Sequence, residues 1–148
     1  MQRVIAYVDG FNFYYSLREL RWERFYWLNF QCLALKLLQP LQELKTTKYF
    51  TTIVGDNEGK RRRQGLYIDA LKTLDNFEIY YGHFLSDTIE CQKCGHIHQT
   101  HHEKMTDVNI AVQMLTDAYQ DNFDIAMLIT ADSDLTNAIV MPCKPSRA

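Results

Sequence analysis

The chain has 148 residues, of which 47% are hydrophobic and 23% are charged, a composition typical of one globular domain with a sizeable core. Its formal net charge of -2 excludes a broadly basic surface for coating nucleic acid, so any polyanion must meet a local positive patch. The first apolar run covers only residues 4–8, which is too short for a membrane span or a signal-peptide core. We therefore expect a soluble, cytoplasmic protein with no membrane partner.

Short β-rich runs alternate with helical patterns, which predicts an α/β fold with a mainly parallel central sheet. The predicted strands cover residues 3–8, 48–54, 78–81 and 124–130. The predicted helices cover residues 12–20, 30–38 with Asn29 as the N-cap, 62–74, 103–119, and a last segment from Ser133 to before Pro142. In the fourth helix, a buried face is predicted by the apolar spacing of residues 108, 111, 112, 115, 118 and 119.

Residues 82–102 fit neither the helical nor the strand period, and they contain all five histidines and two close cysteines. We interpret this Cys/His-rich segment as an insertion within a single domain that spans residues 1–148. Near the chain end, Pro142 and Pro145 leave no room for a further strand after the last helix. The fourth strand should therefore lie at a sheet edge, where its backbone N–H and C=O groups would be unpaired. Three explanations remain open: a truncated C-terminal edge, a homodimer partner that covers the edge, and an altered edge.

Acidic side chains follow two of the predicted strands. Asp9 comes directly after the run 4–8, and Asp132 and Asp134 come just after the run 125–130. Because side chains past the carboxyl ends of parallel strands point into a shared crevice, these three carboxylates should lie close together. Like charges at such distances are tolerated when some protons are retained or a divalent cation lies between them. The pattern therefore predicts a hard-metal site that acts on phosphate.

Two further residues extend this set. Asp107 shares its helical spacing with Ala111 and Ala118, which predicts that it faces the interior, where a carboxylate needs a partner or a cation. The alternative is a partly exposed acid in the first helical turn, where it interacts favourably with the helix dipole. Asn12 stands three residues after Asp9 and can cap a helix or touch a ligand.

A basic run at the start of the third predicted helix comprises Lys60, Arg61, Arg62 and Arg63. Positive charge at this end of a helix opposes the helix dipole, and a phosphate backbone would relieve the repulsion, so we interpret the run as an RNA contact. The alternative is a solvated loop that Asp56 and Glu58 partly neutralise. Aromatic residues crowd the segment 11–30; most should be core, with one or two rings near Asp9 left to stack on unpaired bases of single-stranded RNA.

Cys91 and Cys94 are separated by two residues, as in a zinc knuckle, and histidines follow within the same insertion. Tetrahedral Zn²⁺ accepts two thiolates and two imidazoles, and we assign the imidazoles to His98 and His101. Such a site would staple the insertion beside the crevice and leave catalysis to the aspartates. The alternative is a loop with free, reduced thiols.

Three segments occur in order along the chain: residues 8–12 (VDGFN), 103–108 (EKMTDV) and 129–135 (ITADSDL). They resemble the motifs of NYN domains, a branch of the PIN-like nucleases, in the LabA-like group. The resemblance implies a three-layer Rossmann-like sandwich and a Mg²⁺- or Mn²⁺-dependent ribonuclease. By this analogy the acidic set is Asp9, Asp107, Asp132 and Asp134, and the residues lining it are Asn12, Thr130 and Ser133. The chain departs from the family at its end, where more helix and a further strand would follow Ile139.

The chemistry of such a site assigns direct metal ligation to Asp9 and Asp132. Asp107 and Asp134 would bind through water or help to accept the proton of the attacking water. The competing interpretation is a non-catalytic RNA-binding or regulatory scaffold protein that keeps the same pocket. A haloacid dehalogenase-like phosphatase fits less well, because it needs Asp or Thr where Phe11 stands.

Overall fold

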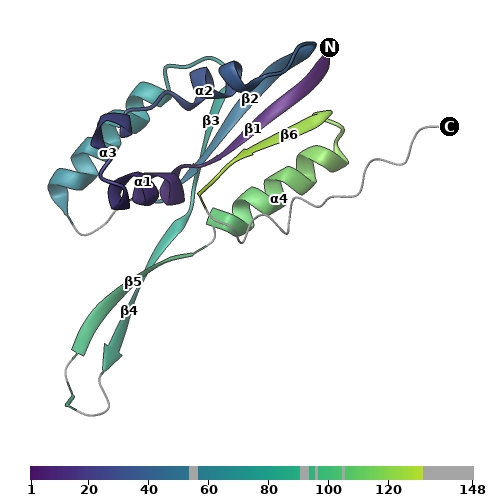
Figure 1. The fold of residues 1–148 in the computed structure, drawn as a ribbon. Helices are drawn as coiled ribbons and strands as arrows, with labels where there is room; N and C mark the ends of the chain where they lie inside the picture. Colours follow the sequence, from purple (N-terminus) through teal and green to yellow (C-terminus); the bar gives the residue numbers. More distant parts are fainter. Residues whose placement is uncertain (54–56, 91–93, 96, 105, 132–148) are drawn as a thin grey trace.

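A four-stranded sheet forms the centre of the computed structural model (Figure 1). The structure describes residues 1–53, 57–90, 94–95, 97–104 and 106–131. For residues 83–90 and 97–104 it describes only the backbone. Its strands are β1 (Gln2–Asp9), β2 (Gln42–Thr51), β3 (Phe77–Tyr81) and β6 (Ile125–Ile129). They lie in the order β3-β2-β1-β6, and each neighbouring pair is parallel. The predicted α/β fold with a parallel sheet is confirmed, and the fourth predicted strand, β6, lies at the edge of the described sheet.

Helices cover both faces of this sheet and complete a three-layer sandwich. One face carries α1 (Gly10–Glu19), the short 3-10 helix η1 (Glu23–Phe25), α2 (Phe30–Leu37) and α3 (Glu58–Leu71), and the other carries α4 (Thr106–Tyr119) (Figure 1). The core on the α4 side contains Ile5, Tyr7, Phe50 and Ile110. The core under the other helices contains Val8, Phe30, Tyr49 and Leu71. Because side chains alternate along a strand, Asp9 at the end of β1 belongs to the same face as Tyr7.

Asparagine caps fix where two helices begin. Asn29 caps α2, as predicted, by accepting a hydrogen bond from the backbone N–H of Cys32 at 3.0 Å. Asn57 caps α3 in the same way through the N–H of Lys60, also at 3.0 Å. Because of this cap, α3 begins one turn earlier than the sequence predicted, and the basic run lies within its first two turns.

The polar insertion is a β-hairpin. Its strands β4 (His83–Glu90) and β5 (Ile97–Lys104) form a separate antiparallel sheet, which extends away from the central one (Figure 1). No strand period is evident in this segment of the sequence, because Ile97 is the only aliphatic residue of β5. The first half of β2, residues 42–46, was missed for a similar reason, since its side chains are polar except for Leu44 and alternate between half-buried and exposed.

The helix α4 turns a different face to the sheet from the one that its apolar spacing predicted. The buried residues are Thr106, Ile110 and Asp117. The exposed ones include Val108 at 56%, Val112 at 56%, Leu115 at 53% and Tyr119 at 93%. The predicted face was therefore wrong: a polar cluster at Asp117, described below, occupies the side of the helix that meets the sheet.

The last predicted helix, from Ser133 to before Pro142, lies outside the described residues. Among the helices that the structure does describe, none combines the length and the apolar character needed to cross a membrane.

Candidate active site

Asp9 is the last residue of β1, is fully buried, and caps α1. Its Oδ1 accepts a hydrogen bond from the backbone N–H of Asn12 at 3.2 Å, and its Oδ2 accepts one from the side-chain amide of Asn12 at 2.7 Å. Thr130, directly after β6, donates its hydroxyl to the same Oδ2 at 3.0 Å. Three residues of the predicted site are thus in contact, and the orientation of the carboxylate is fixed from two neighbouring elements.

Gly10 allows the backbone after Asp9 to pass directly over the ring of Tyr49. A Cβ atom at this position would overlap the ring atoms of Tyr49, which is itself 4% exposed. Burial is the main reason why the pKa of Tyr49 lies above its ordinary value, and the charge of Asp9 adds to this shift. The ring is therefore neutral and held in place beneath the first turn of α1.

The start of α4 lies at the same carboxyl edge of the sheet. The hydroxyl oxygens of Thr52, just past β2, and Thr106, the first residue of α4, are buried and 3.3 Å apart. Asp107 follows in the first helical turn with an exposed side chain. The prediction that it faces the interior was wrong, because the side of α4 that contains Ile110 packs on the sheet. Asp107 belongs to the surface of this edge.

The basic run is divided between two environments. Lys60 and Arg63 line a cavity between α1 and α3, whereas the exposed Arg61 and Arg62 do not line it. The helical turn explains the division, since residues three apart share a face and their neighbours are rotated away from it. Only half of the run is therefore placed at the cavity.

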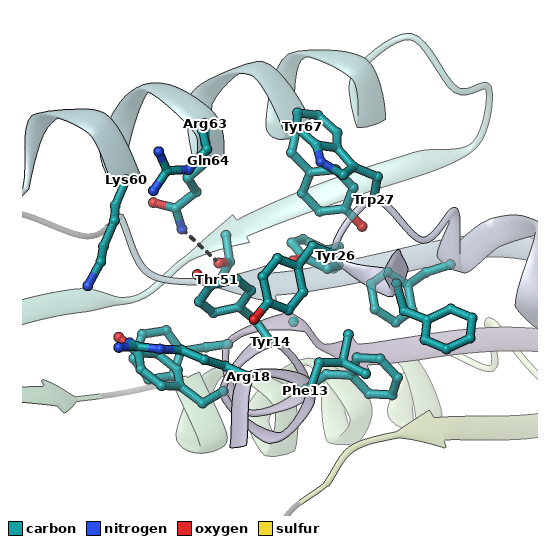
Figure 2. A pocket seen from close by; sticks show the side chains of 17 residues that line it. Phe13, Tyr14, Arg18, Tyr26, Trp27, Thr51, Lys60, Arg63, Gln64 and Tyr67 are labelled. Atoms are coloured by element: carbon teal, nitrogen blue, oxygen red, sulfur yellow. Dashed lines mark hydrogen bonds between the residues drawn. The ribbon is translucent and has the colours of Figure 1, made fainter. Parts of the chain in front are cut away.

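The cavity has a volume of about 160 Å³ (Figure 2). Gly10 and Phe11, the two residues after Asp9, line it, whereas Asp9 itself does not. The sequence predicted that most rings in residues 11–30 are core, yet several of them line this cavity. It missed two residues of α3, Gln64 and Tyr67, that face the same space. Their spacing from the basic residues at positions 60 and 63 is the helical signal that would have found them.

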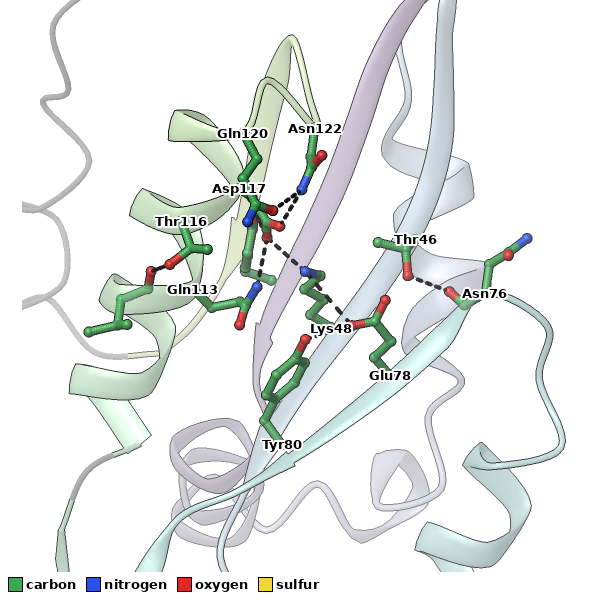
Figure 3. A network of polar contacts seen from close by, with 12 residues as sticks. Thr46, Lys48, Asn76, Glu78, Tyr80, Gln113, Thr116, Asp117, Gln120 and Asn122 are labelled. Carbon is green, nitrogen blue, oxygen red and sulfur yellow. Dashed lines mark hydrogen bonds and ion pairs between the residues drawn. The ribbon is translucent and has the colours of Figure 1, made fainter.

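A buried polar network holds α4 on the sheet (Figure 3). The carboxylate of Asp117 lies 2.7 Å from Nζ of Lys48 on β2 and accepts a hydrogen bond at 2.7 Å from the hydroxyl of Tyr7 on β1. Asn122 donates to its other oxygen at 3.0 Å. Burial alone would raise the pKa of Asp117, but the hydrogen bonds from Lys48, Asn122 and Tyr7 outweigh it and hold the pKa below its ordinary value. The network thereby fixes the helix that carries Asp107.

The remaining predicted site residues lie at or beyond the limit of the described chain. Asp132, Ser133, Asp134 and Cys91 fall outside the described residues, and only the backbone of His98 and His101, on β5, is described. Cys94 is exposed and not in a disulfide. Within the described part of the chain, no group of three or more His, Cys, Asp or Glu side chains is placed to hold a metal.

Comparison with known proteins identifies the family. The family model of the NYN domain matches residues 3–141. The chain is also 27% identical, over 176 aligned positions, to "6-hydroxy-3-succinoylpyridine 3-monooxygenase HspA" of Pseudomonas putida (strain DSM 28022 / S16). That alignment covers 94% of this chain but 55% of the relative, so the chain spans about half of the relative's length. No solved structure matches the chain. From the match over residues 3–141, the chain belongs to the NYN domain family, within the PIN-like, nuclease-like superfamily.

Proposed function

We propose that the chain is a metal-dependent ribonuclease that hydrolyses RNA phosphodiester bonds at the carboxyl edge of the sheet. The observation that carries the proposal is the fully buried carboxylate of Asp9, which Asn12 and Thr130 hold in a fixed orientation. Burying a carboxylate costs free energy, and a helix cap alone does not require it, because Ser or Thr caps a helix equally well. Membership of the NYN family supports the same function.

The oxygen donors of this edge suit a hard divalent cation, Mg²⁺ or Mn²⁺. Asp9 and Asp132 are the proposed direct ligands, and Asp107 and Asp134 are proposed to act through water. When bound, such a cation lowers the pKa of a water molecule and stabilises negative charge on the phosphate. Thr130 contributes by keeping Oδ2 of Asp9 in one orientation.

The phosphate backbone of the RNA is proposed to run along the start of α3. Lys60 and Arg63 face the cavity beside Asp9, and they provide positive charge in a chain whose net charge is -2. Arg61 and Arg62 extend the same positive patch outward for flanking phosphates. Single-stranded RNA suits this surface, since unpaired bases can stack on the rings of the cavity.

The decisive test is cleavage of end-labelled single-stranded RNA in Mn²⁺, with EDTA as the metal-free arm and Asp9→Asn as the variant. Asp69→Asn is the matched control, because the side chain of Asp69 is 71% exposed on α3. We expect cleavage by the wild type and the control, and a loss of at least about a hundredfold in the variant. Mn²⁺ affinity, measured by calorimetry, should fall in the same variant and stay unchanged in the control.

Two outcomes would replace this proposal. Cleavage that persists in Asp9→Asn would show that the activity does not use this site. RNA binding that survives all aspartate-to-asparagine changes, without cleavage by the metal-loaded wild type, would favour the non-catalytic RNA-binding or scaffold role.

The name of the Pseudomonas relative describes a different chemistry, the oxygenation of a pyridine ring. The observation that suits such a compound is the aromatic cavity with Lys60 and Arg63 at its border. A pyridine carboxylate therefore serves as a competitor in the binding experiment described in the next subsection.

A structural Zn²⁺ ion at the hairpin tip is a separate proposal. Cys91, Cys94, His98 and His101 supply the two thiolates and two imidazoles that such a site uses. Bound zinc should be one per chain by elemental analysis and be lost in Cys94→Ser, while Cys32→Ser, at an exposed free cysteine of α2, should keep it. Because such a site needs reduced thiols, we also propose a cytoplasmic location.

A homodimer that forms through the edge of β6 is a separate proposal, and light scattering tests it by measuring the mass in solution.

A further inference from the structure

We propose that the cavity between α1 and α3 binds the base of a pyrimidine nucleotide, so that the enzyme positions single-stranded RNA by holding a uracil or cytosine beside the cleavage site. The proposal rests on the proposed function in its choice of RNA as the ligand. Its basis is the size, the aromatic walls and the charge of the cavity, and its position next to Asp9.

The walls of the cavity are aromatic. Tyr14 on α1 and Tyr26 after η1 lie with their ring centroids 5.1 Å apart, and Trp27 meets Tyr67 of α3 edge-on at 5.7 Å (Figure 2). Trp27 is 56% exposed, which is unusual for so large an apolar side chain when it serves only the core. Stacking on such rings is the general means by which proteins hold unpaired bases.

The size of the cavity selects a single ring. Its volume is about 160 Å³, and an apolar cavity of roughly 150 Å³ accommodates benzene. The six-membered ring of a pyrimidine therefore fits. The cavity is open on one side, so a purine would have to leave part of its second ring outside. Tyr67 limits any enlargement, because its hydroxyl is tied to the backbone carbonyl of Leu28 at 2.6 Å.

The cavity also contains a small number of polar side chains. The side-chain amide of Gln64 donates to the backbone carbonyl of Thr52 at 2.8 Å and lies 3.5 Å from the hydroxyl of Thr51, so amide and hydroxyl groups meet at the inner end of the cavity. A few polar groups in a largely apolar pocket are typical of sites that orient a small heterocycle.

Three cations, Arg18, Lys60 and Arg63, line the same cavity, and within the part of the chain that the structure describes no aspartate or glutamate does. Among the described residues, none of the three takes part in an ion pair. These three cations are therefore available to hold the phosphate of a bound nucleotide. Gly10 and Phe11, the two residues after Asp9, line the cavity, whereas Asp9 itself does not. A base held here would therefore leave the RNA to continue past the start of α1 to the candidate metal site.

The test is competition for a fluorescently labelled uridine hexamer, measured by anisotropy in EDTA so that cleavage and the metal play no part. We expect unlabelled uridine and cytidine hexamers to bind at least about fivefold more tightly than an adenosine hexamer. Because a flexible pyrimidine strand can bind somewhat better for reasons unrelated to a pocket, the preference must also be lost in the cavity variants below.

Two variants and two matched controls locate the site. Tyr14→Ala should weaken binding of the uridine hexamer roughly tenfold, whereas Tyr119→Ala, at a 93% exposed tyrosine of α4, should not change it. Arg63→Gln should weaken it several-fold, while Lys45→Gln, an exposed residue in the first half of β2, should not. Arg63 is exposed, so its variant tests the proposal even if Tyr14→Ala fails to fold.

The proposal is overturned if the adenosine hexamer binds as tightly as the uridine hexamer, or if the variants behave as their controls do. It is also overturned if nicotinate displaces the uridine hexamer at a lower concentration than uridine monophosphate, since the cavity would then be a site for a small aromatic acid. Pyrimidine selectivity without metal-dependent cleavage would reject the nuclease function and keep the subsite. Cleavage that needs Asp9 but shows no preference for pyrimidines would keep the nuclease function and reject the base-binding subsite.

Discussion

Replacing Lys48 with methionine should destabilise the protein strongly, because it leaves a buried carboxylate without its cation. The side chains of Lys48 and Asp117 are 6% and 3% exposed, and they lie 2.7 Å apart. Breaking a buried pair by removing one partner costs about 3–5 kcal/mol. Tyr7 and Asn122 still donate to Asp117 in the variant, so we expect the lower end of this range, about 3 kcal/mol. For a chain of this size, that loss lowers the Tm by about 6–12 °C.

Urea and thermal unfolding of the wild type and Lys48→Met measure this loss. The matched control is Lys72→Met, because Lys72 pairs with Asp69 at 3.3 Å on the surface, where the two side chains are 56% and 71% exposed. The control should cost less than about 1 kcal/mol. A second variant, Lys48→Met with Asp117→Asn, removes both charges and leaves an amide oxygen to accept from Tyr7, so it should recover much of the stability. Equal losses in Lys48→Met and Lys72→Met would refute the assignment of the pair as the anchor of α4.

Three further predictions concern pH and the site. Folding lowers the pKa of Asp117, so the stability that this carboxylate contributes should be fully present above the pKa of the unfolded chain, about 3.8. This stability should be lost as the pH falls through the lower pKa of the folded protein. Urea unfolding at a series of acidic pH values should therefore show a free energy of unfolding that decreases below pH 4. Gly10→Ala should cost about 1–3 kcal/mol in thermal unfolding, because the new Cβ must displace the buried ring of Tyr49; an unchanged Tm would contradict the close contact. Thr130→Val keeps the shape but removes the hydroxyl on Asp9, so it should lower kcat for RNA about tenfold while KM stays the same, and a change confined to KM would argue against an orienting role.

The position of Asp9 could be predicted from the sequence because the strand before it is unmistakable. An apolar run in residues 4–8 makes a central strand, and its end must lie at the carboxyl edge of a parallel sheet. The same reasoning placed residues 125–130 beside it, and the hydrogen bond from Thr130 to Asp9 bears this out. A continuous apolar run is a local property of the sequence, which is why it sufficed to predict this strand.

The orientation of α4 could not be predicted in the same way. Its apolar residues suggested one face, but the sheet presents a lysine at position 48, and the helix meets it with Asp117. A hydrophobic pattern identifies the most apolar face of a helix, and it cannot predict a buried ion pair between segments that are far apart in the sequence. The exposure of Asp107 follows directly, since it belongs to the face that turns away.

The cations of the described chain differ in whether a carboxylate is paired with them. Where the fold needs a cation, the structure gives it a carboxylate: Lys48 meets Asp117 in the core, and Lys72 meets Asp69 on the surface. Lys60 and Arg63 have no such partner in the described part of the chain, although acidic residues outnumber basic ones by 18 to 16. Under the proposed function, Lys60 and Arg63 contact the phosphates of the RNA, and the carboxylate of Asp9 holds the divalent cation.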